Sequence, residues 1–236
     1  MSYTTRPLPT KLVSLVGKQL QVIVKLANIH LTPDNPSYPG GSWHVEGMRN
    51  ERIVASGIYY YHASNITSSK LAFRTAVCEP RYDQGDDKGV QAIYGLANEE
   101  ALSQNLGAVE TFEDRCIAFP NFYQHQVQPF ELEDKTKPGF RKILVFFLVN
   151  PANHIPSTSY VPPQSLELIA ELLRFCMEPW IPMDSALYSK IAAYLVTMTW
   201  EEAVVNRALL MEERKKVTSH TNEFFFERSF SLCEQF

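Results

Sequence analysis

The first two thirds of the chain alternate short apolar runs with turn residues, a pattern typical of a protein built mostly from β-strands. Residues 20–26 and 71–77 partly alternate apolar and polar side chains, whereas residues 53–61 are nearly apolar on both faces. Residues 140–149 form one continuous apolar run after a Pro-Gly pair. We predict a strand in each of these four segments and expect residues 53–61 to be buried.

Two further apolar runs, 107–112 and 115–119, flank a Glu-Asp pair, and we predict a β-hairpin there. Residues 98–104 are the one segment of this β-rich part in which we expect a short helical turn. The acidic stretch RYDQGDDKG (81–89) resembles part of a calcium loop but lacks the distal glutamate of an EF-hand. It is therefore predicted to be a polar loop.

After residue 163 the apolar spacing changes from that of strands to that of helices. Residues 165–177 and 185–198 have apolar side chains at helical intervals and are predicted to be helices. Thr199 and Glu202 have the spacing of a capping box, so a third helix should begin there and continue to about residue 217.

These patterns predict a mainly β fold with a helical C-terminal extension, of the α+β class. We expect residues 1–163 to form the β domain and residues 164–236 to pack on it or beside it. The chain has no internal repeat and no low-complexity segment that would suggest another architecture.

Composition narrows the classes of protein further. The 236 residues are 45% hydrophobic and 20% charged, as in a soluble globular protein. The formal net charge of -4 and the absence of a long Lys/Arg run argue against a nucleic-acid partner, and no segment has the length of a membrane span. The N-terminal residues lack the apolar stretch of a signal peptide. The cysteines are far apart, so we expect reduced thiols and an intracellular, cytoplasmic protein: Cys78, Cys116, Cys176 and Cys233.

The densest chemical signal is the stretch YPGGSWHVEG, which contains His44 and Glu46. A proline and two glycines turn the chain, and the imidazole and the carboxylate then stand two positions apart. Side chains at i and i+2 of an extended segment project from the same face, so both can reach one atom. They would form two thirds of the 2-His-1-carboxylate site that binds Fe(II) and leaves coordination positions open.

His125 is the candidate for the third ligand, because it follows the predicted hairpin, where the next strand should begin. Taken alone, a hydrogen-bonded core or loop histidine is the alternative interpretation. Arg141 stands sixteen positions further, at the start of an apolar strand. Its planar fork could bind a carboxylate of 2-oxoglutarate, and a salt bridge to Glu131 or Glu133 is the alternative.

Three other side chains are candidates for the same interior. Tyr59 and Tyr61 share one face of their strand by alternation, and their hydroxyls could bind 2-oxoglutarate inside a barrel. Packed aromatic rings with satisfied hydroxyls are the alternative. Arg74 could act as an inward clamp for a substrate, but we expect it to lie at the surface.

Three stretches resemble the fungal family known as domain of unknown function 4246: residues 39–61, 119–151 and 212–234. The resemblance covers most of the chain. That family is similar to the 2-oxoglutarate/Fe(II) dioxygenases. The resemblance therefore implies a double-stranded β-helix, the jelly-roll or cupin-like core, with iron at His44, Glu46 and His125 and 2-oxoglutarate at Arg141.

We accordingly expect an Fe(II)/2-oxoglutarate-dependent dioxygenase that hydroxylates a C–H bond of an unknown small-molecule or peptide substrate and releases succinate and CO2. A non-catalytic cupin-like binding module is the first alternative. The second is an interaction domain whose helical tail docks a partner, which predicts an exposed apolar patch on residues 165–217. The same tail could supply a homodimer contact.

Overall fold

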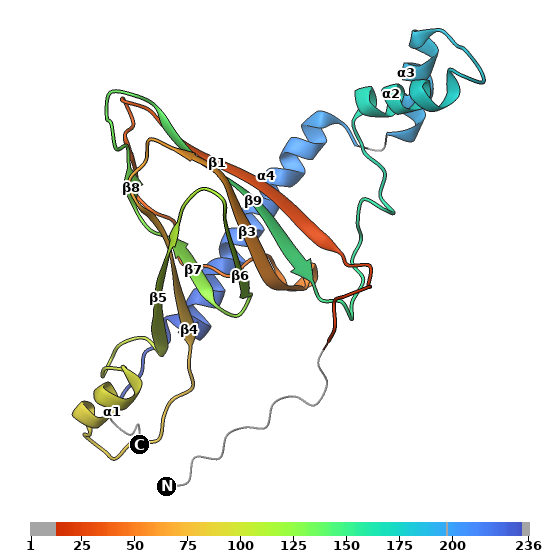
Figure 1. Cartoon of the computed structure of the whole chain (residues 1–236). Coiled ribbons are helices and arrows are strands. Elements are labelled where there is room, and N and C mark those ends of the chain that lie inside the picture. The colour runs from red at the N-terminus through yellow and green to blue at the C-terminus, as the bar shows by residue number, and fades with distance from the viewer. Residues whose placement is uncertain (1–12, 197, 233–236) are drawn as a thin grey trace.

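The computed structural model describes residues 13–196 and 198–232, and it is rich in β-sheet with a helical C-terminal part (Figure 1). The strands are β1 (Val22–Leu31), β2 (Ser37–Tyr38), β3 (Ile53–Ser64), β4 (Ser69–Ala76), β5 (Ser103–Thr111), β6 (Arg115–Pro120), β7 (Gln124–Val127), β8 (Phe130–Glu131) and β9 (Gly139–Val149). The helices are α1 (Asp87–Tyr94), α2 (Leu166–Met177), α3 (Ser185–Leu195) and α4 (Trp200–Thr221), with a 3-10 turn η1 (Arg49–Glu51) and a π-helix η2 (Asn222–Phe226). Within the described residues, no helix combines the length and the apolar character that a membrane span needs.

The strands are arranged in two layers with a short third pairing. One sheet has the order β1-β9-β3-β6, the second has the order β5-β4-β7, and β2 pairs with β8. All pairings between these strands are antiparallel. Strands that are close in the sequence, such as β3 and β4 or β6 and β7, therefore lie in different sheets.

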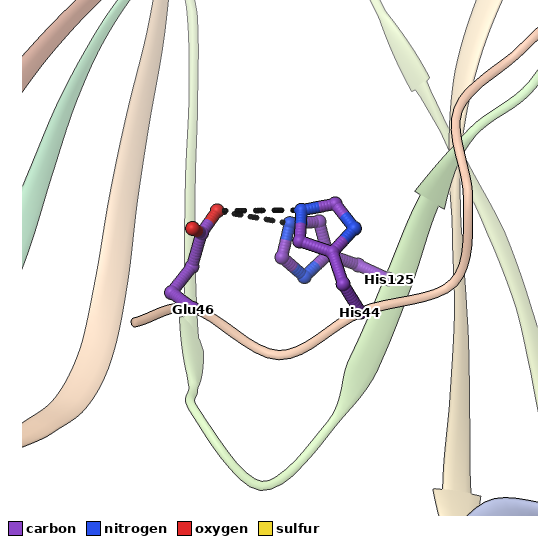
Figure 2. Close-up of side chains that lie close together, drawn as sticks. All are labelled: His44, Glu46 and His125. Atoms are coloured by element: carbon purple, nitrogen blue, oxygen red, sulfur yellow. Dashed lines mark ion pairs between the residues drawn. The ribbon is translucent and has the colours of Figure 1, made fainter. Parts of the chain in front are cut away.

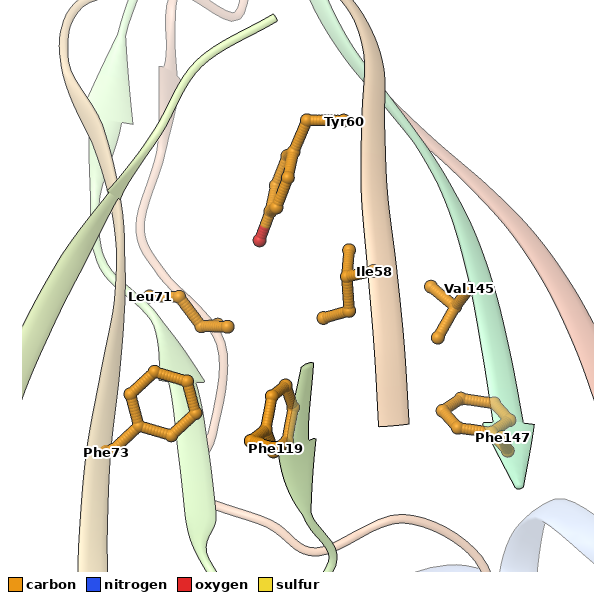
Figure 3. Packing of buried hydrophobic residues seen from close by; sticks show 7 residues of the cluster. All are labelled: Ile58, Tyr60, Leu71, Phe73, Phe119, Val145 and Phe147. Atoms are coloured by element: carbon orange, nitrogen blue, oxygen red, sulfur yellow. The ribbon is translucent and has the colours of Figure 1, made fainter. Parts of the chain in front are cut away.

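The main hydrophobic core lies between the two larger sheets (Figure 3). Along β3, the buried positions alternate, as expected for a strand with one face covered. The buried residues of this core come from both layers: Ile58, Tyr60, Phe119, Val145, Phe147, Leu71 and Phe73. A second cluster packs around α1 and includes residues from the C-terminal tail: Val90, Leu96, Leu102, Phe230 and Leu232.

The four strands predicted from apolar pattern are all present as β1, β3, β4 and β9, and β1 continues as far as Leu31. The predicted hairpin is wrong, because β5 pairs with β4 whereas β6 pairs with β3. The turn between them explains the difference. Asp114 has a left-handed backbone with φ 64°, and its N–H donates to the carbonyl of Tyr60 at 2.8 Å. That bond ties the turn to β3 and sends β6 into the other sheet.

The helical turn predicted for residues 98–104 is also wrong. The Leu102 N–H donates to the Arg228 carbonyl at 2.8 Å, and Ala101 forms a β-bridge with Ser229. Backbone groups that a helix would use are thus paired with the C-terminal tail. The helix of this region is α1, which begins near the end of the stretch predicted to be a polar loop, where the side chain of Asp86 accepts the Gly89 N–H.

The three predicted C-terminal helices are present, and the capping box of Thr199 and Glu202 opens α4 as expected. Helix α4 is longer than predicted and passes directly into η2. Helices α2 and α3 pack on each other apart from the sheets, whereas α4 runs back along them (Figure 1). The tail after α4 then packs with the β-rich part, so the division at residue 163 stays a prediction.

Candidate metal centre

The segment between β2 and β3 carries His44 and lies alongside β7. The Gly41 N–H donates to the Val127 carbonyl at 2.9 Å, and His44 and His125 exchange backbone hydrogen bonds of 3.2 and 3.0 Å. Gly40 has φ 98°, and a Cβ there would stand 3.1 Å from the Val127 carbonyl oxygen. Glycine therefore permits this close approach of two backbones. The result is that His44 lies directly beside His125.

Glu46 is held by a side chain that the sequence did not single out. The Glu46 N–H donates to Oδ1 of Asn121 at 2.8 Å, and Nδ2 of Asn121 donates to the carbonyls of Glu46 and Ile53 at 2.9 and 3.2 Å. The chain then turns at Gly47, where φ is 70° and a Cβ would lie 2.6 Å from Cδ1 of Ile53. Asn121 thus fixes the backbone that carries the carboxylate.

His44, Glu46 and His125 converge on one point (Figure 2). Oε1 of Glu46 is 3.7 Å from Nε2 of His44 and 3.3 Å from Nε2 of His125. One ligand atom from each residue lies within 4.8 Å of the others. Metal–ligand bonds of about 2.0–2.2 Å place neighbouring ligand atoms roughly 3 Å apart, so the two contacts of Glu46 are close to the spacing that a metal ion requires.

The surroundings of the two imidazoles differ in a way that suits a metal centre. Nδ1 of His44 lies 2.8 Å from the Ser42 carbonyl oxygen, and an Nδ1 proton donated there leaves the Nε2 lone pair directed at the shared point. His125 is buried against the rings of Phe73 and Phe119, whereas the side chain of His44 is 32% exposed. The site is therefore closed on the His125 side and open on the His44 side.

The three groups also shift one another's protonation. Burial would raise the pKa of Glu46, but its contacts with His125 and His44 outweigh burial and hold that pKa well below its usual range. Burial would lower the pKa of His44, but the contact with Glu46 and the bond to the Ser42 carbonyl raise it. Burial leaves the pKa of His125 lowered. Glu46 is thus held ionised, and a metal ion at the shared point would compete with protons for His44.

Arg141 is a buried cation on β9 that faces the same interior. It is 3% exposed, its Nη1 donates to Oγ of Ser69 at 2.6 Å, and its guanidinium lies 5.2 Å from the ring centroid of Tyr60. Its Nε has no hydrogen-bond partner, and no carboxylate pairs with it among residues 13–196 and 198–232. The alternative of a salt bridge to Glu131 or Glu133 is therefore wrong. A buried guanidinium without an acidic partner is suited to bind an anion.

Tyr59 and Tyr61 do not face this interior, and the expectation that they line it is wrong. The Tyr59 hydroxyl donates to Oδ1 of Asp114 at 2.8 Å, and the Tyr61 hydroxyl donates to Oδ1 of Asn28 at 3.3 Å, both near solvent. Tyr60 points inward instead, because the alternation of β3 places it on the face of the core (Figure 3). Burial raises the pKa of Tyr60, so it stays protonated.

The expected surface position of Arg74 is wrong as well. Its side chain is only 13% exposed, and Nε donates to Oε1 of Gln124 at 2.7 Å. Nη2 forms an ion pair with Glu227 at 2.6 Å. The C-terminal tail covers this face of the sheet, a contact between residues too distant in the sequence for a local pattern to reveal.

The chain is similar to parts of two solved dioxygenases at low sequence identity. One is a selenomethionine-labelled Fe(II)/α-ketoglutarate-dependent dioxygenase, TqaL, at 16% identity and a TM-score of 0.34, over 58% of this chain and 44% of that one. Another is the hydroquinone 1,2-dioxygenase PnpCD, in complex with Cd2+ and 4-hydroxybenzonitrile, at 15% identity and a TM-score of 0.28, over 58% of this chain and 63% of that one. In both cases the match spans less than two thirds of the other protein.

Comparison with curated proteins gives no match. A family model, in contrast, matches residues 6–172, which is more than half of the chain and includes all three converging side chains and Arg141. The resemblance seen in the sequence is thereby confirmed. The chain belongs to the family described as protein of unknown function DUF4246.

Proposed function

We propose that the chain is an Fe(II)- and 2-oxoglutarate-dependent oxygenase that hydroxylates a C–H bond of a substrate and releases succinate and CO2. The observation that carries the proposal is the convergence of His44, Glu46 and His125 from two distant segments. Two imidazoles and one carboxylate on one side of a metal leave positions free for other ligands.

The residues present fit the metal. Nε2 of His44, Nε2 of His125 and Oε1 of Glu46 would hold it, and the Ser42 carbonyl supports one imidazole from behind. When bound, Fe(II) would supply the activation of O2 that couples decarboxylation of 2-oxoglutarate to oxidation of the substrate. The protein itself contributes ligands, orientation and a largely buried setting on the His125 side.

Arg141 would bind the distal carboxylate of 2-oxoglutarate. Its planar fork matches a carboxylate, and Ser69 and the rings of Tyr60 and Phe130 orient it without neutralising it. Arg141 and His125 both contact side chains of the same core, which supports their acting on one bound molecule. The low exposure of Arg141 would keep water away from that ion pair.

A double-stranded β-helix is the fold that we propose for the β-rich part. The order β1-β9-β3-β6 in one layer and β5-β4-β7 in the other supports it, because the chain passes repeatedly between the layers, as in jelly rolls. The His44 segment extends the short β2–β8 pairing along β7 and so enlarges the second layer.

A second function is favoured by the helical arm, the segment of residues 165–217, which exposes large apolar side chains. Trp180 and Tyr194 are 85% and 90% exposed, and Trp200 is exposed as well. Apolar side chains gathered on a surface commonly mark an interaction site. The chain would then be a binding or interaction module of cupin-like fold without turnover.

One experiment separates these functions. Anaerobic protein loaded with Fe(II) is titrated with 2-oxoglutarate to detect the visible charge-transfer absorption, and succinate release is then measured with O2 and ascorbate. We expect both signals in the parent and neither in His44→Ala. His62→Ala is the matched control, since His62 pairs with Glu113 at 2.9 Å on the outer surface. Absence of both signals in the metal-loaded parent would refute the oxygenase and favour the binding module.

A further inference from the structure

The face of β7 opposite the metal centre is covered by the C-terminal part of the chain. Neighbouring residues of a strand point to opposite faces, so Gln124 points away from the interior that His125 enters. Gln124 is nevertheless 0% exposed. Its side chain meets Arg74, its direct partner in the β4–β7 register, and Asn222 from η2.

The side-chain amide of Asn222 connects the two segments that carry the histidines. Its Oδ1 accepts a hydrogen bond from Nε2 of Gln124, the residue before His125. Its Nδ2 donates to the carbonyl of Trp43, the residue before His44, at 3.4 Å. Both ends of one amide are therefore used, one on each ligand-bearing segment.

The surrounding contacts hold that amide in place. Arg74 donates to Gln124 at 2.7 Å and pairs with Glu227 at 2.6 Å, and its guanidinium lies 4.9 Å from the ring centroid of Trp43. The π-helical turn η2 begins at Asn222, and such turns often occur at functional sites. The arrangement is thus a packed and charged layer directly behind the metal centre.

The His44 segment needs such support because it is not part of a continuous strand ladder. His44 forms an isolated β-bridge with His125, so two backbone hydrogen bonds fix their relative position. We infer that Asn222 is a positioning residue of the metal centre, which holds the His44 segment against β7 at the spacing that a metal requires. This inference rests on the proposed function, since the spacing matters only where both histidines bind one ion.

The test measures the Co(II) dissociation constant from visible absorption, with Co(II) alone as the probe. Asn222→Ala removes both contacts. Asn222→Asp keeps the oxygen that Gln124 uses and replaces the donor to the Trp43 carbonyl with a second oxygen. Asn206→Ala is the matched control, an exposed asparagine of α4 whose side chain contacts the sulfur of Met198.

We expect both Asn222 variants to bind Co(II) about 10- to 100-fold more weakly, as is typical when a residue that orients a metal ligand is lost. The Co(II) absorption spectrum should also change in Asn222→Asp, because the ligand geometry changes, whereas Asn206→Ala should match the parent. Thermal unfolding of the metal-free variants checks the fold, and if Asn222→Ala does not fold, Asn222→Asp decides.

Parent-like Co(II) affinity and spectrum in Asn222→Asp would overturn the inference and leave the proposed function intact. Failure of the parent itself to bind Co(II) would overturn the proposed function, and the inference with it. The two failures are therefore distinguishable in one titration series.

Discussion

Replacing Arg141 with methionine should stabilise the metal-free protein while removing its affinity for 2-oxoglutarate. Methionine has a similar length and no charge, so it can fill the space between Tyr60, Phe130 and Ser69. If Arg141 serves binding at a cost in stability, its replacement should raise the free energy of unfolding and weaken 2-oxoglutarate binding. If Arg141 serves packing, its replacement should lower the free energy of unfolding.

The magnitude follows from the contacts of the guanidinium. Its buried Nε is unsatisfied, which costs about 1–3 kcal/mol, and desolvation of an unpaired charge adds several more. The hydrogen bond to Ser69 returns about 1.5–3 kcal/mol, and each nearby ring returns about 0.5–2 kcal/mol. Burial also lowers the pKa of Arg141, in keeping with a charge that lacks compensation. Replacement of buried charges by apolar groups commonly stabilises by about 1–4 kcal/mol, and we expect a gain in the lower half of that range because Ser69 loses its partner.

The assay is urea unfolding of the parent and of Arg141→Met without metal, together with the anaerobic 2-oxoglutarate titration. Lys142→Met is the control: Lys142 is the next residue, faces the other side of β9, and lies over the ring of Phe140. Its free energy of unfolding should change by about 0.5 kcal/mol or less. Loss of more than about 1 kcal/mol in Arg141→Met, with 2-oxoglutarate binding retained, would refute the reasoning, because Arg141 would then be a structural residue.

Three further outcomes are expected. Asn121→Ala should lower the free energy of unfolding by about 1–3 kcal/mol and weaken Co(II) binding, because the Glu46 N–H loses its acceptor; unchanged urea curves and titrations would contradict this. The pKa of Glu46 is lowered on folding. The stabilisation that the ionised Glu46 carboxylate gives the folded state is therefore fully present above its ordinary pKa of 4.5 and is lost as pH falls below that value. The metal-free parent should therefore lose more stability than Glu46→Gln as pH falls from 4.5 to 3.5, and parallel losses in urea unfolding over this range would count against the contact with the histidines. We also propose that the helical arm forms a homodimer contact, so that Trp180→Glu with Tyr194→Glu sediments as a monomer while the parent sediments as a dimer; a monomeric parent would exclude it.

The candidate site could be predicted from the sequence where the local geometry of the strands fixes the direction of a side chain. His44 and Glu46 are two positions apart on an extended segment, so alternation alone predicts that they share a face. The sequence pattern predicts His125 at the start of a strand, and β7 begins at Gln124. The three side chains could therefore be grouped from short sequence patterns, without knowledge of which strands pair with one another.

Other features depend on contacts that no local pattern contains. Alternation predicts which residues of β3 share a face but not which face is buried. Because β3 is nearly apolar on both faces, its composition does not show which face is buried either. In the structure, Tyr60 rather than Tyr59 faces the core. The turn at Asp114 looks like a hairpin until its bond to Tyr60 is known. Asn121 and Asn222 act through side-chain contacts with segments remote in the sequence.

The pairing of residues 99–102 with the C-terminal tail bears on how the chain is made in the cell. Synthesis proceeds at about 5–20 residues per second, so many seconds pass between the appearance of α1 and that of Phe230 and Leu232. During that interval Val90, Leu96 and Leu102 lack the two side chains that later cover them. The nascent chain thus exposes these apolar side chains, and chaperone binding should be strongest just before residues 230–232 emerge from the ribosome.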